Sequence, residues 1–257
     1  MLKGVNFMVQ SSIALESRRD QLLSMLRRDG SISLAEAAAT LGISEMTVRR
    51  DLQEMEQNGM ARRVRGGAVA VGPERFQRRS GMASAAKQVI AKKLVSLAPH
   101  SGTMALDASS TIHQFALVLE PRDITVLCTG METMGVLSQS GKVRVLLSGG
   151  EVEETTGALV GSLALRTIEQ FVFTRSFVSP TCVHPDFGLM ESTIEGSDIK
   201  RAISNASTSL VVAADSTKLG GTSMARTLSL ENLEFLVTEL DPRDSRLDPY
   251  RDQVELL

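Results

Sequence analysis

Apolar positions in the first quarter of the chain repeat at helical spacing and predict three helices followed by a hairpin. In the third helix, Val48, Leu52 and Met55 recur at intervals of four and three residues, which places them on one face. Long polar side chains, including Arg50 and Gln53, fall on the opposite face at about 100° per residue. This helix can therefore pack on a core with one face and present the other to a partner.

Two shorter helices are predicted before it. The first spans residues 17–28, and the second begins at the capping-box residue Ser33 and ends in the turn Leu41-Gly42-Ile43. Ser44 then caps the third helix, and Asn58-Gly59 ends it. Helix, helix, short glycine-containing turn and helix is the order of a helix-turn-helix, whose last helix enters the major groove of DNA.

The segment Met60–Val71 predicts a short hairpin that turns at Gly66-Gly67, in the position of a wing. Arginines on this hairpin would neutralise phosphates, which positions a protein on DNA without reading sequence. On the third helix, Arg50 can donate two hydrogen bonds to a guanine edge, and Gln53 can pair with adenine. The predicted DNA-binding residues are Ser44, Met46, Thr47, Arg49, Arg50, Gln53, Arg62, Arg63 and Arg65.

Two alternatives remain open for these residues. The arginines can form a solvated surface, or they can contact phosphates without reading any base. Arg49 can instead pair locally with Gln53 or Glu56.

Beyond the hairpin the periodicity changes. Residues 72–82 contain Pro73 and three arginines without strong periodicity and predict a linker. From residue 83 on, short runs rich in Val, Leu and Ile alternate with helical stretches, which predicts an α/β domain with a mostly parallel β-sheet flanked by helices. The expected strands are Thr103–Leu106, Ile124–Cys128, Val143–Leu147, Ser176–Val178, Leu210–Ala214, Phe235–Thr238 and, at one edge, Gln253–Leu257. The expected helices are Ala85–Leu97, Ile112–Leu119, Met131–Ser138, Ser162–Gln170 and Ser197–Ala206.

Charge divides the chain near the same place. Residues 1–80 carry 13 Lys and Arg against 9 Asp and Glu, a net charge of +4, whereas residues 81–257 carry 15 against 21, a net charge of −6. This asymmetry indicates that only the first part meets a polyanion, although chance clustering of solvated charge would give the same totals.

Other residue types exclude several classes of protein. Cys128 and Cys182 lie in apolar surroundings, and no Cys or His stands at ligand spacing, so we expect buried free thiols and no metal site. No apolar run approaches the length of a membrane span, and Met1–Ser12 lacks the hydrophobic core of a secretion signal. We expect a loose tail over residues 1–12, no cofactor, no membrane association and a cytoplasmic location.

Ligands of open α/β sheets lie beyond the carboxyl ends of the strands, so the loops after the strands are candidate binding segments. After the first strand, hydroxyl side chains and free backbone N–H groups at a helix N-terminus can form an anion cradle, or can simply cap the helix. Glycines after later strands allow a ligand to approach the backbone, or make a turn. The residues predicted from these loops are Asp107, Ser109, Ser110, Thr111, Thr129, Gly149, Gly150, Asp215, Ser216 and Lys218.

From about Ser17 to its end, the chain resembles the DeoR-type family of bacterial transcriptional regulators. The most specific match is the segment Ser44–Leu52, followed by Gly59, Arg63 and Gly66-Gly67-Ala68, with Arg65 where the family usually has His. Further matches are Leu106-Asp107-Ala108, Ser148-Gly149-Gly150, Ile199-Lys200-Arg201 and the segment Ala214–Gly220.

The resemblance implies an N-terminal winged helix-turn-helix and a C-terminal domain of the ribose-5-phosphate isomerase type. Such a domain is expected to bind a phosphorylated sugar or a related metabolite that alters affinity for the operator, and Lys200 joins the candidate effector-binding residues. The expected organisation is a tail (1–12), a DNA-binding domain (13–71), a linker (72–82) and an effector-binding and oligomerisation domain (83–257).

The chain departs from the family pattern at several effector positions. Ser109 stands where a phosphate-loop glycine is usual, Ile112 replaces a threonine, and Cys128-Thr129 replaces Thr-Asn. Thr174 stands where an acidic residue is usual, and Ser179 and Cys182 replace glycines. Losing an Asn and an acidic residue removes groups suited to holding sugar hydroxyls.

Three functions follow as hypotheses. The first is a repressor controlled by an anionic metabolite, acting as a homodimer or homotetramer because dimers span two half-sites. The second is a regulator whose second domain serves assembly alone. The third is an isomerase or deaminase fused to a DNA-binding module, which would need an acid/base pair drawn from Asp107, Asp215 and Glu195. These candidates lack a companion motif, so we expect a regulator with no catalytic residues rather than an enzyme.

Overall fold

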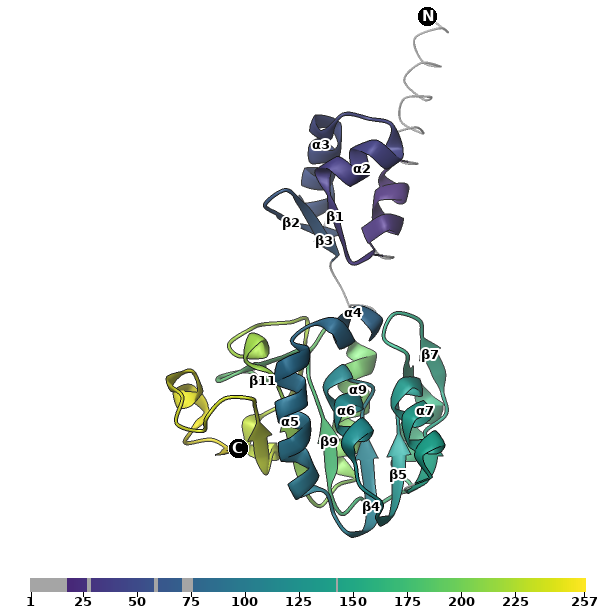
Figure 1. Cartoon of the computed structure of the whole chain (residues 1–257), viewed down its shortest axis with the longest axis vertical. Coiled ribbons are helices and arrows are strands. Elements are labelled where there is room, and N and C mark those ends of the chain that lie inside the picture. The colour runs from purple at the N-terminus through teal and green to yellow at the C-terminus, as the bar shows by residue number, and fades with distance from the viewer. Residues whose placement is uncertain (1–17, 27–28, 58–59, 71–75, 142) are drawn as a thin grey trace, which may run out of the picture. The chain divides into compact units, whose positions relative to one another are not determined.

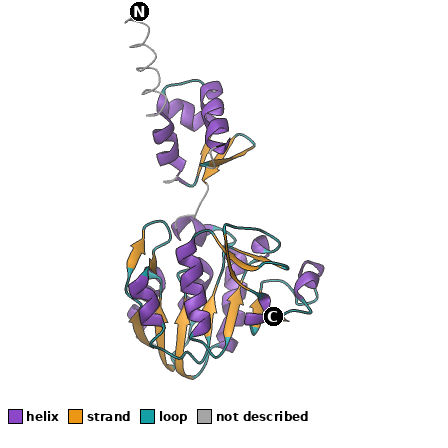
Figure 2. Ribbon diagram, turned by 180° about the vertical axis from the view of Figure 1, so that it is seen from behind, coloured by secondary structure: helices purple, strands orange, loops and turns teal. Residues whose placement is uncertain are grey.

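The computed structural model describes residues 18–26, 29–57, 60–70, 76–141 and 143–257 (Figures 1 and 2). Its contacts divide the chain into two units, residues 1–75 and residues 76–257. The expected tail over residues 1–12 and the expected helix end at Asn58-Gly59 lie outside the described residues.

The first unit has the predicted helix-turn-helix with a hairpin behind it. Ser33 caps the second helix by accepting a hydrogen bond from the Glu36 amide, and Gly42 ends that helix at a φ of +64°. The predicted inward face of the third helix is confirmed, because Val48, Leu52 and Met55 are buried in one core. The elements are a helix over residues 18–26, α2 (Leu34–Leu41), α3 (Glu45–Gln57), β1 (Ser31–Ser33), β2 (Ala61–Val64) and β3 (Gly67–Ala70).

The sequence pattern did not predict β1, which pairs antiparallel with β3 and makes the hairpin a three-stranded sheet. The two strands approach so closely that a Cβ at Gly67 would lie 2.0 Å from the Ile32 carbonyl oxygen. A second link joins the helices, since the buried Asp51 carboxylate accepts hydrogen bonds of 2.5 and 2.9 Å from Arg18. The hairpin and α3 therefore pack on one small core, and the Arg18–Asp51 contact links α3 to the first helix.

The second unit is built on a seven-stranded sheet, and every pairing within it is parallel. The expected strands and the expected edge strand at the C-terminus are confirmed, with ends shifted by at most two residues. In spatial order the strands are β15 (Glu255–Leu256), β14 (Phe235–Val237), β12 (Leu210–Ala213), β9 (Ser176–Val178), β4 (Ser101–Leu106), β5 (Asp123–Cys128) and β6 (Arg144–Leu147).

Helices cover both faces of this sheet, as predicted (Figures 1 and 2). Alternate residues of β4 point to opposite sides: Met104 and Leu106 join a core with α5, α6 and α7, whereas Ala105 joins the core of α8 and α9. The helices are α5 (Ser84–Leu97), α6 (Ser110–Val118), α7 (Met131–Ser140), α8 (Ser162–Ile168) and α9 (Ile194–Asn205). Cys128 and Cys182 are buried free thiols, as expected, and burial raises the pKa of Cys128 to about 12.

Several short elements were not predicted. Residues 72–82 were expected to be a linker, but α4 (Phe76–Gly81) forms within them, and contacts assign it to the second unit. The described part of the second unit also contains two small antiparallel sheets and three 3-10 helices outside the parallel sheet. They are β7 (Glu151–Glu153) with β8 (Ala158–Val160), β10 (Cys182–His184) with β11 (Gly188–Glu191) and β13 (Ala225–Leu228), and the helices η1 (Ser216–Lys218), η2 (Leu230–Asn232) and η3 (Ser245–Tyr250).

Candidate functional site

The polar face of α3 is exposed over its first three turns. Met46 is 61 % exposed, and Arg49, Arg50 and Gln53 are also exposed, whereas Thr47 is half-buried. No described residue forms a hydrogen bond or ion pair with the side chains of Arg50 or Gln53. A helix seated by one apolar stripe thus offers its long polar side chains to a partner.

Some of the predicted contact residues already have partners within the unit. The Ser44 hydroxyl caps α3, since it accepts from the Thr47 amide at 3.2 Å and lies 2.9 Å from the Thr47 hydroxyl. Arg63 braces the hairpin against α3 by donating to Glu56 through its side-chain Nε at 2.7 Å and its amide at 2.8 Å. Glu56, one alternative partner of Arg49, is therefore engaged by the wing instead.

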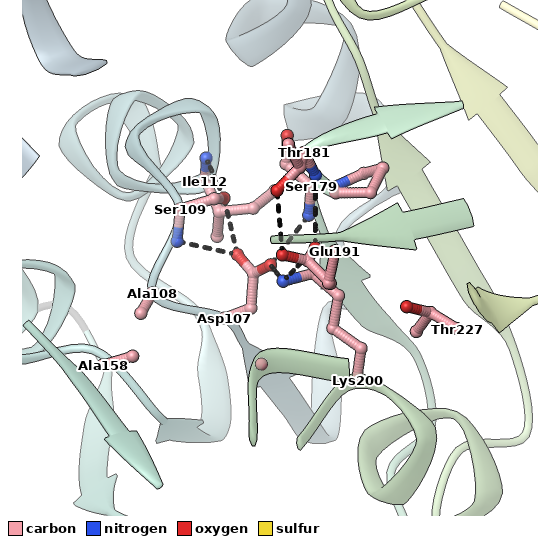
Figure 3. A network of polar contacts seen from close by, with 12 residues as sticks. Asp107, Ala108, Ser109, Ile112, Ala158, Ser179, Thr181, Glu191, Lys200 and Thr227 are labelled. Carbon is pink, nitrogen blue, oxygen red and sulfur yellow. Dashed lines mark hydrogen bonds and ion pairs between the residues drawn. The ribbon is translucent and has the colours of Figure 1, made fainter. Parts of the chain in front are cut away.

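The second candidate site lies between β4 and β9, where the order of the strands in the sheet reverses. We call this place the switch point. From β4 the chain proceeds to β5 and β6 on one side, whereas β9, β12 and β14 follow on the other. The loops after the neighbouring strands β4 and β9 therefore part at this point, which is where open α/β sheets bind ligands. Asp107 follows β4, and its Oδ2 accepts a 2.8 Å hydrogen bond from the Ser179 amide after β9 (Figure 3).

Asp107 is fully engaged by neighbouring groups. Its carboxylate also accepts from the amide and the hydroxyl of Ser109, at 3.0 and 2.5 Å, and Lys200 Nζ lies 3.1 Å from Oδ2. Four donors match the four lone pairs of a carboxylate, and the side chain is buried. Asp107 therefore joins three segments of the chain and has no acceptor capacity left for a sugar hydroxyl.

Lys200, from α9, lies between two buried carboxylates. Its Nζ is 2.9 Å from Glu191 Oε1, and Glu191 also accepts from the amide and hydroxyl of Thr181, at 3.2 and 3.1 Å (Figure 3). Burial alone would lower the pKa of the Lys200 ammonium, but the carboxylates of Glu191 and Asp107 raise it above its ordinary value. The predicted residues Asp107 and Lys200 therefore both lie at the site, where they pair with protein groups. We call Asp107, Glu191 and Lys200 the brace.

Sequence reasoning missed Glu191, the second carboxylate of this brace. The only signal was an acidic residue at the end of the apolar run Gly188-Leu189-Met190, nine positions before Lys200. Such a residue reads as the solvated end of a strand, and only the fold shows that it is buried beside an ammonium group.

Unused donors gather at the N-terminus of α6. Ser109 caps the helix by accepting from the Ile112 amide at 3.2 Å, and the other first-turn amides have no acceptor within the helix. The hydroxyls of Thr111 and of Thr129, which follows β5, are buried and have no hydrogen-bond partner among the described residues. We call Ser109, Ser110, Thr111 and Thr129 the anion cradle.

Lys218 approaches from the opposite side of the switch point. Its Nζ donates to the Ser179 hydroxyl at 2.8 Å and the Pro180 carbonyl at 2.7 Å, both uncharged groups. Burial lowers the pKa of the Lys218 ammonium to about 8, although the carboxylates of Asp215 and Glu191 oppose this shift. Among the described residues, no carboxylate forms an ion pair with the Lys218 ammonium, so its positive charge is not directly neutralised.

Other predicted residues serve local structure. Asp215 caps η1 by accepting from the Thr217 amide at 3.2 Å, and the Ser216 amide donates to Glu239. Gly150 has a φ of +107°, and a Cβ there would lie 2.4 Å from the Val160 carbonyl oxygen, so this glycine is needed for packing. The structure thus brings the cradle, Asp107, Lys200 and Lys218 to one edge, and assigns Gly150 to the packing of α8.

The described residues show neither a metal site nor a membrane-spanning helix. Within the part of the chain that the structure describes, no group of three or more His, Cys, Asp or Glu could hold a metal ion. None of the described helices is long and apolar enough to cross a membrane.

Replacing Glu191 tests the brace. Glu191→Gln leaves the buried Lys200 ammonium with one carboxylate, and we expect the free energy of unfolding of the second unit to fall by about 3 kcal/mol. Glu195→Gln, an exposed substitution four residues on, is expected to change it by less than about 0.5 kcal/mol. Urea unfolding followed by circular dichroism measures both. Equal effects of the two substitutions would contradict the role of Glu191.

Comparisons with known proteins agree with this architecture. Residues 18–74 match the model of the DeoR-like helix-turn-helix domain, and residues 82–240 match the model of the DeoR C terminal sensor domain. The chain is 30% identical to the HTH-type transcriptional regulator GolR of Listeria innocua over 86% of this chain and 89% of that protein. It is 32% identical to the lactose phosphotransferase system repressor of Lactococcus lactis, over 78% of this chain and 82% of that one.

Among solved structures, ribose 5-phosphate isomerase A from Methanocaldococcus jannaschii is 16% identical, with 52% of this chain and 53% of that chain covered and a TM-score of 0.39. The relatives are named as regulators and repressors, in agreement with the expectation of a regulator rather than an enzyme. The chain belongs to the DeoR family of helix-turn-helix transcriptional regulators.

Proposed function

We propose that this regulator represses an operon of carbohydrate metabolism and that a small anionic metabolite, such as a phosphorylated sugar, controls its affinity for the operator. The observation that supports effector control is the anion cradle, where the buried hydroxyls of Thr111, in the first turn of α6, and of Thr129, after β5, have no hydrogen-bond partner among the described residues. Support for the target comes from relatives, which include lactose phosphotransferase system repressors and a putative aga operon repressor of Escherichia coli.

The DNA half rests on the exposed face of α3 and on the wing. We propose that Arg50 and Gln53, both exposed on α3, read base edges, and that Arg62 and Arg65, both exposed on the hairpin, hold phosphates. Arg63 fixes the wing through Glu56 rather than extending freely. Because one recognition helix covers one half-site, we propose that the protein acts on the chromosome in the cytoplasm as a homodimer or homotetramer.

The proposal of an effector rests on which polar groups at the switch point are already paired and which are not. Asp107 and Lys200 are saturated by neighbouring residues, so they hold the loops in place. The donors left for an anion are the first-turn amides of α6, the hydroxyls of Ser110, Thr111 and Thr129, and the ammonium of Lys218. Amides at a helix N-terminus and a nearby ammonium favour a phosphate group, so we propose that the phosphate provides most of the binding energy.

A second function stays open, in which the C-terminal unit serves assembly alone. It is favoured by the saturation of Asp107 and Lys200, which leaves few side-chain acceptors for sugar hydroxyls. The two functions differ in one respect: only a regulator with an effector changes its affinity for DNA when a metabolite is added.

The test is a titration of operator affinity. The operator is a duplex that the full-length protein selects from randomised DNA. Fluorescence anisotropy measures the dissociation constant for this duplex while pentose and hexose phosphates are added. Unphosphorylated sugars are the controls. We expect one phosphorylated sugar to change the dissociation constant for DNA by at least about fivefold. If no phosphate has an effect, the effector half fails, and if no duplex is selected, the DNA half fails.

The role of Lys218 predicts a pH dependence of the same titration. The ammonium is charged below its pKa of about 8. Phosphate monoesters are already dianions above neutral pH, so loss of the Lys218 charge is expected to weaken effector binding about tenfold between pH 7 and pH 9.5. Lys218→Met should bind weakly at both pH values, and Lys92→Met, an exposed lysine on α5, should match the wild type. An unchanged pH profile in Lys218→Met would contradict this role.

Base reading and phosphate binding predict different mutant behaviour. Arg50→Ala is expected to lower affinity for the selected duplex by about 1–3 kcal/mol while retaining most affinity for random DNA. Arg65→Ala should weaken binding to both duplexes alike and reduce the salt dependence. Equal losses on both duplexes for Arg50→Ala would contradict base reading by this residue.

A further inference from the structure

Helix α4 is the first element of the second unit, so it directly follows the chain that leaves the DNA-binding unit. It lies beside α6 at the carboxyl-end edge of the sheet (Figure 1). The Phe76 amide donates to the Thr155 carbonyl at 3.2 Å, and the buried Phe76 ring meets His113 of α6 edge to face at 5.1 Å. Six residues are too few for an isolated helix, so α4 depends on these contacts.

Arg79 attaches α4 to the residue that precedes the anion cradle. Its Nη2 donates to the Thr156 carbonyl at 3.1 Å and to the Ala108 carbonyl at 3.5 Å, and its guanidinium lies 5.6 Å from the centre of the Phe76 ring. Ala108 stands directly between Asp107 and Ser109, so the same loop contacts both Arg79 and the brace. Any movement of this loop therefore moves an acceptor of Arg79.

The β7–β8 hairpin, which supplies the other acceptor of Arg79, is tied to the cradle from the far side. The Leu159 amide donates to the Thr129 carbonyl at 2.8 Å, and the Met131 amide donates to the Gly157 carbonyl at 3.2 Å. Lys87 completes the attachment: its buried ammonium donates to the carbonyl of Arg79 and to that of Met82 at 2.7 Å, at the end of α4. The helix is thus held by both loops that border the cradle.

We propose that α4 couples the anion cradle to the DNA-binding unit, with Arg79 as the positioning residue. The inference rests on the proposed function. While Arg79 holds α4 on Ala108 and Thr156, the first helix of the second unit is fixed on the loop after β4. We expect this attachment to restrict the spacing of paired recognition helices. A phosphate at the N-terminus of α6 adds a charged acceptor next to the Ala108 carbonyl that Arg79 contacts, so effector binding changes this attachment and with it the affinity for two correctly spaced half-sites.

The test compares two duplexes bound by full-length protein. One is the selected operator, and the other has five base pairs inserted between its half-sites, which rotates them by about half a helical turn. Wild type and Gln77→Ala, an exposed substitution on the same helix, are expected to bind the expanded duplex at least about tenfold more weakly. Arg79→Ala, which removes the contacts of α4 with the Ala108 and Thr156 carbonyls, is expected to distinguish the two duplexes by less than about threefold.

The pentose and hexose phosphates of the titration above provide a second readout. In Arg79→Ala we expect the active phosphate still to raise the melting temperature of the protein, because the cradle is intact, but no longer to change affinity for DNA. Spacing discrimination equal to that of Gln77→Ala, or a selected duplex with a single half-site, would overturn the proposal. Failure of the proposed function is distinguishable, since it would appear as no selected duplex or no active phosphate.

Discussion

The ammonium group of Lys200 lies between two buried carboxylates, 3.1 Å from Asp107 and 2.9 Å from Glu191. Three charges removed from water are stable only when each is paired and hydrogen-bonded, and here the amides and hydroxyls around Asp107 and Glu191 supply the remaining bonds. The brace joins the loops after β4 and β9 to β11 and α9. The positions of the cradle and of Lys218 at the switch point depend on it.

This constraint gives a structural role to residue types that would also suit a ligand. Asp107 and Lys200 have the chemistry expected of sugar-phosphate contacts, yet each is saturated by protein groups. The groups left over are hydroxyls, helix amides and the Lys218 ammonium, all suited to an anion. Ser109 strengthens this division because its hydroxyl donates to Asp107 and also caps α6 by accepting from the Ile112 amide.

Periodicity in the sequence was sufficient for the large elements. The apolar stripe of Val48, Leu52 and Met55 predicted the face on which α3 is seated, and buried runs such as Ile124–Cys128 predicted the strands of the sheet. Short elements escaped because tertiary contacts stabilise them: β1 has three residues, and α4 depends on Arg79 and Lys87. Glu191 escaped because sequence spacing does not show which carboxylate lies beside Lys200. For the same reason the sequence did not predict that Asp107, which follows a strand, pairs with Lys200, which only the family resemblance indicated.

The account assigns DNA binding to the first unit and effector binding to the second. Hydrogen–deuterium exchange of the full-length protein tests this separation most directly. With the selected duplex bound, the account predicts slower exchange in α3 and in β2 and β3. With the active phosphate bound, it predicts slower exchange over residues 108–112 and 215–220. Protection by the phosphate confined to other segments, or by DNA confined to the second unit, would contradict it.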